Sequence, residues 1–494
     1  MKDPKRFRLD FPEFYLKTGD QIHDVFTQLG FNPGIVDKAF ANTVEIASKC
    51  EIDLSTPQRD GKPGDGKPTL SYPNFTLPEG KTSNYDYFIE LIKKGWQTCN
   101  IPNTDEYRDR LKMEVDVFKK TGFIDYMLIV QDYVGWAQSQ GIMLGMARGS
   151  ASGSLVAYLL RIIDVDPVKH GLNFYRFMNP ERVSPPDIDV DIQASRREEV
   201  KQYITNKYEG KVVNIGTYPA LRSKGVVRDA CRVLEVPLNI QTEILDAIPV
   251  ENDHEDASKQ IKLKDAYKEY PEFKAVADKY PRLFKIIFRL EGLKKAEGVH
   301  ASGVVISPGD ITELVPLRIN KEVLSTQFDA EDIEKLGLLK VDLLGLKMLD
   351  TAVETLKLLD PEDNVVWSKI PEDDPKTWGL ICSGVTKGIF QLENPQMRKL
   401  LLDIHPRNIR DLATILALFR PGPARAGLVQ EYTASRLNPH TINFGHPGVK
   451  KVLGSTFNVM IFQEDLMQLT KELAGFTDGE ADNFRRMVGK QKPD

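Results

Sequence analysis

The 494-residue sequence lacks several features that define other classes of protein. It has no apolar run near the ~20 residues that a membrane-spanning helix needs, and its basic start, Met1–Arg6, is not followed by the apolar core of a secretory signal. The four cysteines, Cys50, Cys99, Cys231 and Cys382, form no Cys-x-x-Cys pair, so neither a zinc site nor a disulfide framework is indicated. We therefore expect a cytoplasmic, reducing setting, in a bacterial cell or a phage-infected host.

Histidine is also scarce, with 7 residues dispersed along the chain. This disfavours a phosphohydrolase, since such enzymes usually carry several histidine ligands; His300, the only histidine near a candidate strand, is more often structural in this setting. The net charge of −5 argues weakly against nucleic-acid binding by bulk attraction, but a basic channel within an acidic surface remains compatible with it.

The most informative feature present is an acidic strand at Pro186–Ile192, in which Asp187, Asp189 and Asp191 alternate with apolar residues. In a β-strand these carboxylates share one face, while the apolar residues bury the other. Side-by-side carboxylates repel and need a counter-charge, which divalent cations such as Mg²⁺ or Mn²⁺ supply. A second strand, 338–343, places Lys340 and Asp342 on one face.

Two alternatives to this metal site remain open. One is an acidic strand that is simply solvated. The other is a calcium loop, because Asp187, Asp189, Asp191 and Glu198 have the spacing of EF-hand ligands; however, Ile192 stands where that loop requires glycine.

Glu198 has a second interpretation. Residues 195–198 read as a capping box that opens a helix extending to about Tyr208, with Gly210 as its stop.

A glycine- and serine-rich segment, Gly145–Ser154, leads into a predicted helix through Leu155 and Ile163. Its backbone N–H groups and the helix dipole are suited to phosphate oxygens, with Arg148 adding charge. It is not a Walker P-loop, since no Gly-Lys-Ser/Thr follows. A loop that merely connects two elements is the alternative.

The rest of the chain divides by composition. Residues 54–84 read as an exposed linker, 85–140 as helical and 218–297 as a helical insertion. In that insertion Val226, Val227, Ala230, Val233 and Leu234 are predicted to share an apolar face. Lys224, Arg228 and Arg232 recur on another face, which fits a ridge that tracks a phosphate backbone or an ordinary solvated face.

Together, these parts favour nucleotidyl transfer. Two metals ~4 Å apart can activate an attacking oxygen and stabilise a leaving one. Phosphoryl chemistry otherwise needs mainly positioning and charge neutralisation, which the loop and the basic residues can supply.

Several segments, in this order, resemble the family C replicative DNA polymerases, the bacterial DNA polymerase III alpha subunits. They are 148–150, 174–184, 186–191, the region of His300, 326–329, 340–346, 390–393 and 419–423. The resemblance covers residues 30–494. It implies template-directed DNA synthesis from dNTPs on a primed DNA template, with two Mg²⁺ or Mn²⁺ ions.

The resemblance also implies a fold and a set of site residues. The fold is a mixed α/β (α+β) protein with a polymerase-beta-like palm (85–217 and 298–355), a helical thumb (218–297), partial helical fingers (356–494) and an N-terminal helical lead-in with a linker (1–84). The implied catalytic metal ligands are Asp187, Asp189 and Asp342, with Asp191 supporting them. The implied nucleotide-binding residues are Arg148, Gly149, Ser150, Arg176, Lys340, Arg420, Arg485 and Arg486, and DNA is assigned to Lys224, Arg228 and Arg232.

The sequence departs from the family pattern at both ends. The metal-dependent phosphoesterase-like (PHP) domain, the remaining fingers, the clamp-binding segment and the OB-fold are not seen. We expect a truncated form, or a split polymerase that needs a separate C-terminal chain and reaches a sliding clamp through that partner. Two other functions remain open: a non-catalytic assembly piece and a template-independent nucleotidyltransferase.

Overall fold

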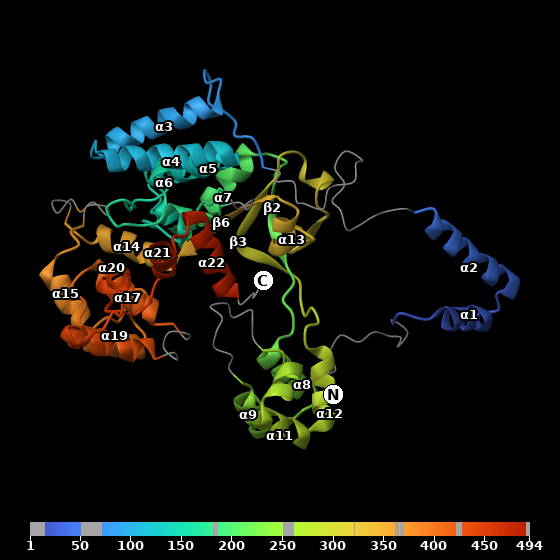
Figure 1. Cartoon of the computed structure of the whole chain (residues 1–494). Coiled ribbons are helices and arrows are strands. Elements are labelled where there is room, and N and C mark those ends of the chain that lie inside the picture. The colour runs from blue at the N-terminus through green and yellow to red at the C-terminus, as the bar shows by residue number, and fades with distance from the viewer. Residues whose placement is uncertain are drawn as a thin grey trace.

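The computed structural model describes residues 15–50, 72–180, 186–249, 261–320, 322–360, 365, 370–420 and 427–490. Most of the predicted 54–84 linker, the ends of the 174–184 and 419–423 segments and the last four residues lie outside these ranges. None of the helices within them combines the length and the apolar character required to cross a membrane. Helices surround a single sheet in this part of the chain, giving a mixed α/β protein (Figure 1).

The sheet has six strands in the order β1-β6-β3-β2-β5-β4. β1 runs parallel to β6 and β2 parallel to β5, while the other neighbours are antiparallel. The strands are β1 (Asp189–Gln193), β2 (Val212–Thr217), β3 (Gly298–Ile306), β4 (Leu317–Asn320), β5 (Val323–Thr326) and β6 (Leu339–Leu346). The two predicted acidic strands are thus direct neighbours.

Each face of the sheet has its own apolar core. Ile188, Val190 and Ile192 are buried together with alternate residues of β6 and β3 against a helical layer, as the strand alternation predicts. Figure 1 shows the long helices of this layer stacked beside the sheet. The layer consists of α3 (Asn84–Thr98), α4 (Asp105–Thr121), α5 (Ile124–Ser139), α6 (Leu155–Leu159) and α7 (Arg197–Lys207). The predicted helical stretch 85–140 is confirmed.

The opposite face is covered only in part. A smaller core joins Val213 and Val305 to α13 (Ala330–Lys335) and the 3-10 helix η4 (Ile311–Glu313). Side chains of β6 point alternately to the two faces of the sheet. Lys340 and Asp342 therefore lie on this second face, next to the smaller core but not part of it.

Two local predictions are wrong. The helix after the glycine-rich segment, α6, ends at Leu159 rather than continuing through Ile163, because Arg161 adopts a left-handed backbone (φ 61°). The capping box at Ser195 does not form, although α7 has nearly the predicted bounds. The Ser195 hydroxyl donates instead to Asp350 (2.5 Å), and Glu198 pairs with Arg197.

Between β2 and β3 the chain forms a separate helical module with its own core, here called the 221–290 module. It contains α8 (Ser223–Val233), α9 (Leu238–Ala247), α10 (Leu263–Glu269), α11 (Pro271–Lys279) and α12 (Pro281–Leu290). Two backbone hydrogen bonds close its stem: the Leu221 N–H donates to the Leu293 carbonyl, and the Gly292 N–H donates to the Leu221 carbonyl. Figure 1 shows the module projecting from the sheet. Leu234, predicted to be buried, is 40% exposed because α8 ends just before it; Cys231 is buried instead.

The described part of the chain after β6 is mainly helical, as predicted, and residues from its stretch 378–461 form one further core. We call residues 370–490 the C-terminal helical region. The helix α14 (Lys347–Lys357) precedes this region. The described α-helices of the region are α15 (Pro375–Cys382), α16 (Pro395–Ile404), α17 (Ile409–Leu418), α19 (Leu428–Leu437), α20 (Pro447–Leu453), α21 (Gln463–Ala474) and α22 (Asp478–Lys490). Asn179 donates to the Gly479 carbonyl (3.2 Å), so α22 lies against the sheet-bearing part.

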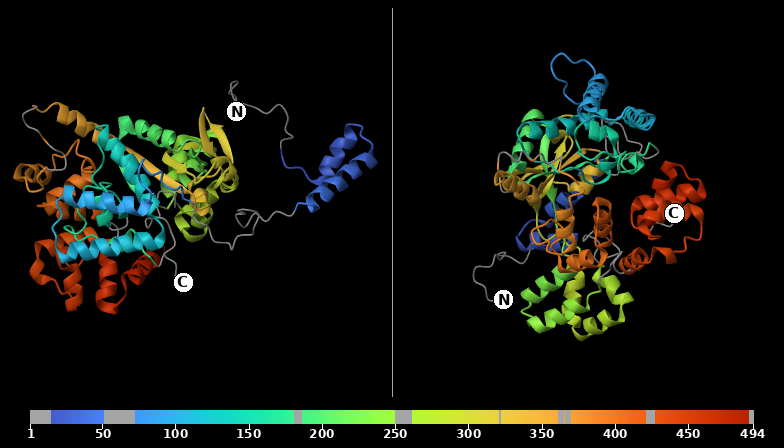
Figure 2. Two further views of the ribbon diagram at one scale, coloured as in Figure 1. Left: turned by 90° about the horizontal axis from the view of Figure 1, so that it is seen from above. Right: turned by 90° about the vertical axis from the view of Figure 1, so that its left-hand side faces the viewer.

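The remaining elements are short or peripheral. α1 (Gly19–Gln28) and α2 (Pro33–Ser48) pack on each other and stand apart from the other elements in Figure 1 and in the left-hand view of Figure 2. The other 3-10 helices in the described residues are η1 (Ser150–Gly153), η2 (Phe174–Arg176), η3 (Ala194–Arg196), η7 (Pro439–Thr441) and η8 (Gly454–Thr456).

Candidate active site

Three carboxylates meet where β1 and β6 lie side by side. The parallel register places Asp189 directly beside Asp342, and Asp187 lies two residues before Asp189 on the same face. One carboxylate oxygen from each of the three lies within 4.8 Å of those of the other two. The strand pairing therefore brings together the three residues that the sequence resemblance assigned to metal binding.

The charges in this group are incompletely balanced. Burial, and then repulsion from Asp342, raise the pKa of Asp189, while desolvation and Asp189 raise the pKa of Asp187. The nearest cation is Lys340, whose Nζ lies 3.0 Å from Asp342 Oδ2 and 3.3 Å from a carboxylate oxygen of Glu334. Burial acts to lower the pKa of Lys340, but these acids outweigh it and raise that pKa.

The donor set fits a divalent cation. Asp342 Oδ1 is buried and has no hydrogen-bond partner among the described residues, although its neighbour Oδ2 is held by Lys340. A buried carboxylate oxygen without a partner is costly unless a ligand supplies one. Three hard oxygen donors and no nitrogen or sulfur suit Mg²⁺ or Mn²⁺.

Asp191, the fourth predicted ligand, lies outside this group of three. Its Oδ1 accepts a hydrogen bond from Arg148 (3.2 Å), and the same guanidinium lies 3.8 Å from Asp189. The main chain of Gly145 also presses on Asp191, since a Cβ on Gly145 would lie 2.7 Å from Asp191 Cβ. Asp191 thus fixes the glycine-rich segment and Arg148 against β1.

Gly149 and Ser150 lie beside the acidic group. Gly149 has a φ of 64°, and a Cβ there would lie 3.6 Å from Asp189 Oδ2, so the segment passes close to the carboxylates. Ser150 begins the 3-10 helix η1. The following α6 helix does not offer its N-terminus to a ligand: the buried Glu114 accepts from the N–H groups of Leu155 and Val156 (2.9 Å each). This corrects the expectation that a helix dipole supports phosphate here.

Two of the predicted nucleotide-binding arginines have carboxylate partners in the C-terminal helical region. Arg176 donates to Glu464 of α21 (2.6 Å), and Arg485 donates to Asp482 (2.7 Å) and to Gln463 (2.9 Å). Arg486 is half-buried, and no partner for it is found among the described residues. The remaining one, Arg420, is exposed directly after α17.

The predicted DNA-binding residues lie elsewhere, on α8 of the 221–290 module (Figure 1). Arg228 and Arg232 are exposed and Lys224 is half-buried. Arg232 lies 3.3 Å from Asp229. The structure therefore does not bring this ridge into the acidic group itself.

His300 has a structural role, as its isolation in the sequence indicated. Its Nδ1 accepts a hydrogen bond from the Gly303 N–H (2.7 Å), which shapes β3 beside Asp342. A Cβ at Gly303 would lie 2.8 Å from this nitrogen and 3.3 Å from Asp342 Oδ1, so the glycine leaves space for both groups.

Sequence reasoning missed Glu114, Arg110 and Glu464. Arg110 and Glu114 have the i, i+4 spacing of an ordinary helical ion pair, which gives no sign of the contacts they make. Glu464 lies 288 residues from Arg176, and no local pattern announces that contact.

Two family models match the chain. The bacterial DNA polymerase III alpha NTPase domain matches residues 86–345, and the bacterial DNA polymerase III alpha subunit finger domain matches residues 345–494. The chain is 37% identical to DNA polymerase III subunit alpha of Aquifex aeolicus, over 93% of this chain and 41% of that protein. For the subunits of Campylobacter jejuni and Thermus aquaticus the identities are 36% and 34%, over all of this chain and 42% and 44% of theirs. The chain spans about two fifths of the length of these relatives.

Proposed function

The chain belongs to the bacterial DNA polymerase III alpha family, and on this premise we propose that it carries the nucleotidyl-transfer centre of a template-directed DNA polymerase. The observation that carries the proposal is the group of Asp187, Asp189 and Asp342 between β1 and β6, with its partnerless oxygen on Asp342. The reaction is attack of a primer 3′-hydroxyl on the α-phosphate of a dNTP, with release of pyrophosphate.

Different parts of the chain correspond to the palm, the thumb and the fingers of a polymerase. Residues 85–217 and 298–355 form the palm with the sheet, 218–297 the thumb, and 356–494 part of the fingers, while 1–84 precede them as a helical lead-in with a linker. The separate cores of the 221–290 module and of the C-terminal helical region support these divisions.

Asp187, Asp189 and Asp342 would hold two Mg²⁺ ions, which would supply charge neutralisation for the attacking and leaving oxygens. Arg148 is held over Asp189 by Asp191, so its guanidinium is preorganised toward the incoming phosphates. Lys340, placed between Asp342 and Glu334, neutralises excess negative charge before the substrate arrives.

The triphosphate is bound by the N–H groups of Gly149 and Ser150, by Arg148 and by Arg176. Arg176 must exchange its Glu464 partner for phosphate, so nucleotide binding changes a contact between palm and fingers. Arg485, Arg486 and Arg420 are assigned to the fingers side of the nucleotide. Lys224, Arg228 and Arg232 contact the phosphate backbone of the primer–template duplex.

Primer extension tests the proposal. The full chain is incubated with Mg²⁺, four dNTPs and a short primed template, beside Asp189→Ala and the control Asp310→Asn, which alters an exposed helix-capping acid on the same body. We expect extension in template order by the wild type and the control, and none by Asp189→Ala. Substantial activity of Asp189→Ala would refute the assignment.

The same assay separates the alternatives. Product that ignores the template sequence would identify a template-independent nucleotidyltransferase. Extension that begins only when the C-terminal part of a relative is added would identify a half-enzyme with a partner chain. Folded protein that extends no primer under either condition would identify a non-catalytic piece.

A further inference from the structure

A fully buried acidic residue, Glu114 of α4, binds the glycine-rich segment from behind. Its carboxylate accepts hydrogen bonds from the Ser154 hydroxyl (2.8 Å) and from the N–H groups of Leu155 and Val156 (2.9 Å each). Arg110, one helical turn earlier, donates to the same carboxylate (2.6 Å). A buried charge with this many donors holds them in one geometry.

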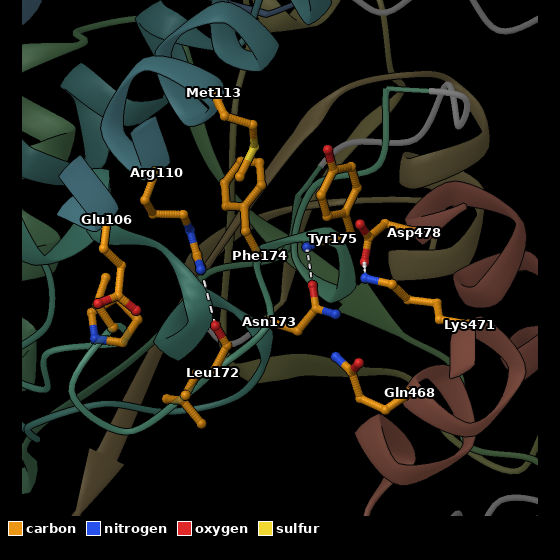
Figure 3. A pocket seen from close by; sticks show the side chains of 13 residues that line it. Glu106, Arg110, Met113, Leu172, Asn173, Phe174, Tyr175, Gln468, Lys471 and Asp478 are labelled. Carbon is orange, nitrogen blue, oxygen red and sulfur yellow. Dashed lines mark hydrogen bonds and ion pairs between the residues drawn. The ribbon is translucent and has the colours of Figure 1, made fainter. Parts of the chain in front are cut away.

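Arg110 extends this network to a second segment. Its guanidinium donates to the Gly153 carbonyl, in the glycine-rich segment, and to the Leu172 carbonyl (3.1 Å), two residues before η2. It also lies 5.9 Å from the ring centroid of Phe174. Figure 3 shows Arg110 reaching Leu172 at the wall of a cleft of about 330 Å³ between α4 and α21.

The two segments also touch each other directly. A Cβ on Gly153 would lie 2.4 Å from the carbonyl oxygen of Asn173, closer than any side chain permits. One of these segments carries Gly149 and Ser150, and the other carries Arg176. The relative placement of the two segments therefore depends on the close contact between Gly153 and Asn173 and on the Arg110 and Glu114 side chains of α4.

We propose that Arg110 and Glu114 are positioning residues for the incoming triphosphate: together they fix the Gly149–Ser150 N–H groups relative to the Arg176 guanidinium. The inference rests on the proposed function, since it concerns the same nucleotide site. Neither residue touches the acidic group, so neither is catalytic. Their effect is on geometry, and a displacement of about 1 Å among phosphate-binding groups is enough to weaken binding strongly.

A test must separate positioning from simple stability. Removing one member of the pair leaves a buried charge without its partner. Replacing both removes the two charges together but leaves their other partners, such as the N–H groups of Leu155 and Val156, without hydrogen bonds. Both changes lower stability, so the variants are compared at a temperature at which each of them is folded. The informative variants are therefore Glu114→Gln and the double variant Arg110→Met/Glu114→Met. The matched control is Asp132→Met/Lys207→Met, which removes another 2.6 Å ion pair of the same body without touching either segment.

The first measurement is amide hydrogen exchange of the full-length chain. We expect faster exchange at Leu155, Val156 and residues 172–177 in both Arg110/Glu114 variants, with other regions unchanged in the double variant. The control should leave both segments protected.

The second measurement is single-nucleotide incorporation on a primed template, with the affinity for dNTP and Mg²⁺ measured separately by calorimetry. We expect KM for dNTP to rise about tenfold in the double variant, more than kcat falls, at a temperature well below the Tm of every variant. An unchanged KM in the double variant, or an equal rise of KM in the control, would overturn this inference but leave the proposed function in place. A wild type that neither binds nor incorporates dNTP would overturn the proposed function, and the inference with it.

Discussion

Asp411 of the C-terminal helical region and the aspartates between β1 and β6 are the same residue type in opposite electrostatic surroundings. In the helical region Asp411 accepts from Arg436 (2.8 Å) and from the Arg407 N–H (3.0 Å); burial acts to raise its pKa, but these donors outweigh burial and lower it. In the sheet, Asp187 and Asp189 have raised pKa values because burial and neighbouring acids both act against the charged form.

This difference separates acids that stabilise the fold from acids that await a ligand. Asp482 sharpens the distinction: one of its oxygens also has no partner among the described residues, yet its other oxygen is held by Arg485 through two donors. A guanidinium already balances that charge. Asp187, Asp189 and Asp342 lie together, and two cations do not balance them, because Lys340 also pairs with Glu334 and Arg148 also pairs with Asp191.

The largest expected effect is a reciprocal pair of alanine substitutions. Asp342→Ala should reduce nucleotide incorporation by at least about 10³-fold, because several kcal/mol of charge stabilisation disappear. It should leave Tm at or above the wild-type value, because repulsion with Asp189 is relieved. Asp411→Ala should retain activity and lower the free energy of unfolding by about 2 kcal/mol, since two hydrogen bonds to a charged group are lost. The measurements are primer extension and denaturant unfolding.

If Asp342→Ala instead unfolded the protein, or if Asp411→Ala abolished incorporation without loss of stability, the distinction between the two kinds of acid would be wrong. Asp342→Asn, which keeps the size of the side chain and removes its charge, is the control for packing.

The second prediction concerns pH and metal. Asp187 and Asp189 have raised pKa values in the folded protein, so the metal-free protein loses stability as the pH rises above their unfolded pKa of about 4. Asp411 has a lowered pKa, so it contributes stability that is lost as the pH falls through its folded pKa. Mg²⁺ competes with protons for Asp187 and Asp189, so the gain in Tm on adding Mg²⁺ should be larger at pH 7.5 than at pH 5. At 100 times Kd the gain corresponds to about 2.7 kcal/mol.

Thermal unfolding with Mg²⁺ and with EDTA at the two pH values measures this. Asp189→Ala should lose most of the Mg²⁺ gain, and Asp411→Ala should keep it. An equal gain in wild type and Asp189→Ala would place the bound metal elsewhere.

The alternation in residues 186–192 predicted the buried and acidic faces of β1 correctly, because a strand with one buried face has a strict period of two. The pairing of β1 with β6 is not in that pattern, since register between distant strands depends on the whole sheet. The glycine-rich segment was recognised, but its helix was predicted too long because propensity does not reveal the left-handed turn at Arg161.

The missed features share one cause, which is competition from residues distant in sequence. Ser195 has the local signature of a cap, yet Asp350, 155 residues away, takes its hydroxyl. The N-terminus of α6 looked available for phosphate, but Glu114 already occupies it. Local patterns state what a group can bind, and only the fold decides which partner reaches it.

The third prediction concerns the contact that joins the two regions. Glu464→Gln removes the carboxylate that competes with phosphate for the half-buried Arg176, so KM for dNTP should fall by up to about fivefold, which corresponds to the free energy of a surface ion pair. Arg176→Ala should raise that KM. The matched control is Glu472→Gln, on the same helix as Glu464, which breaks the pair of Glu472 with Lys451 of α20 and should leave KM unchanged. A rise in KM with Glu464→Gln would mean that this carboxylate positions Arg176 rather than competes for it.

The smallest expected effect extends the comparison from acids to bases on α8. Arg232 lies beside Asp229, which also pairs with Lys295 (2.5 Å), whereas no acidic partner is found for Arg228 among the described residues. A paired arginine releases fewer counterions from DNA, because part of its charge is already neutralised. In a plot of the logarithm of the binding constant against the logarithm of the salt concentration, Arg228→Ala should therefore reduce the steepness of the slope by about one unit, and Arg232→Ala by less. Fluorescence anisotropy of a labelled primed duplex, titrated across a series of KCl concentrations, measures both slopes. Equal slopes for the two variants would mean that DNA displaces Asp229 from Arg232, and that pairing in the free protein does not predict which charges the bound complex uses.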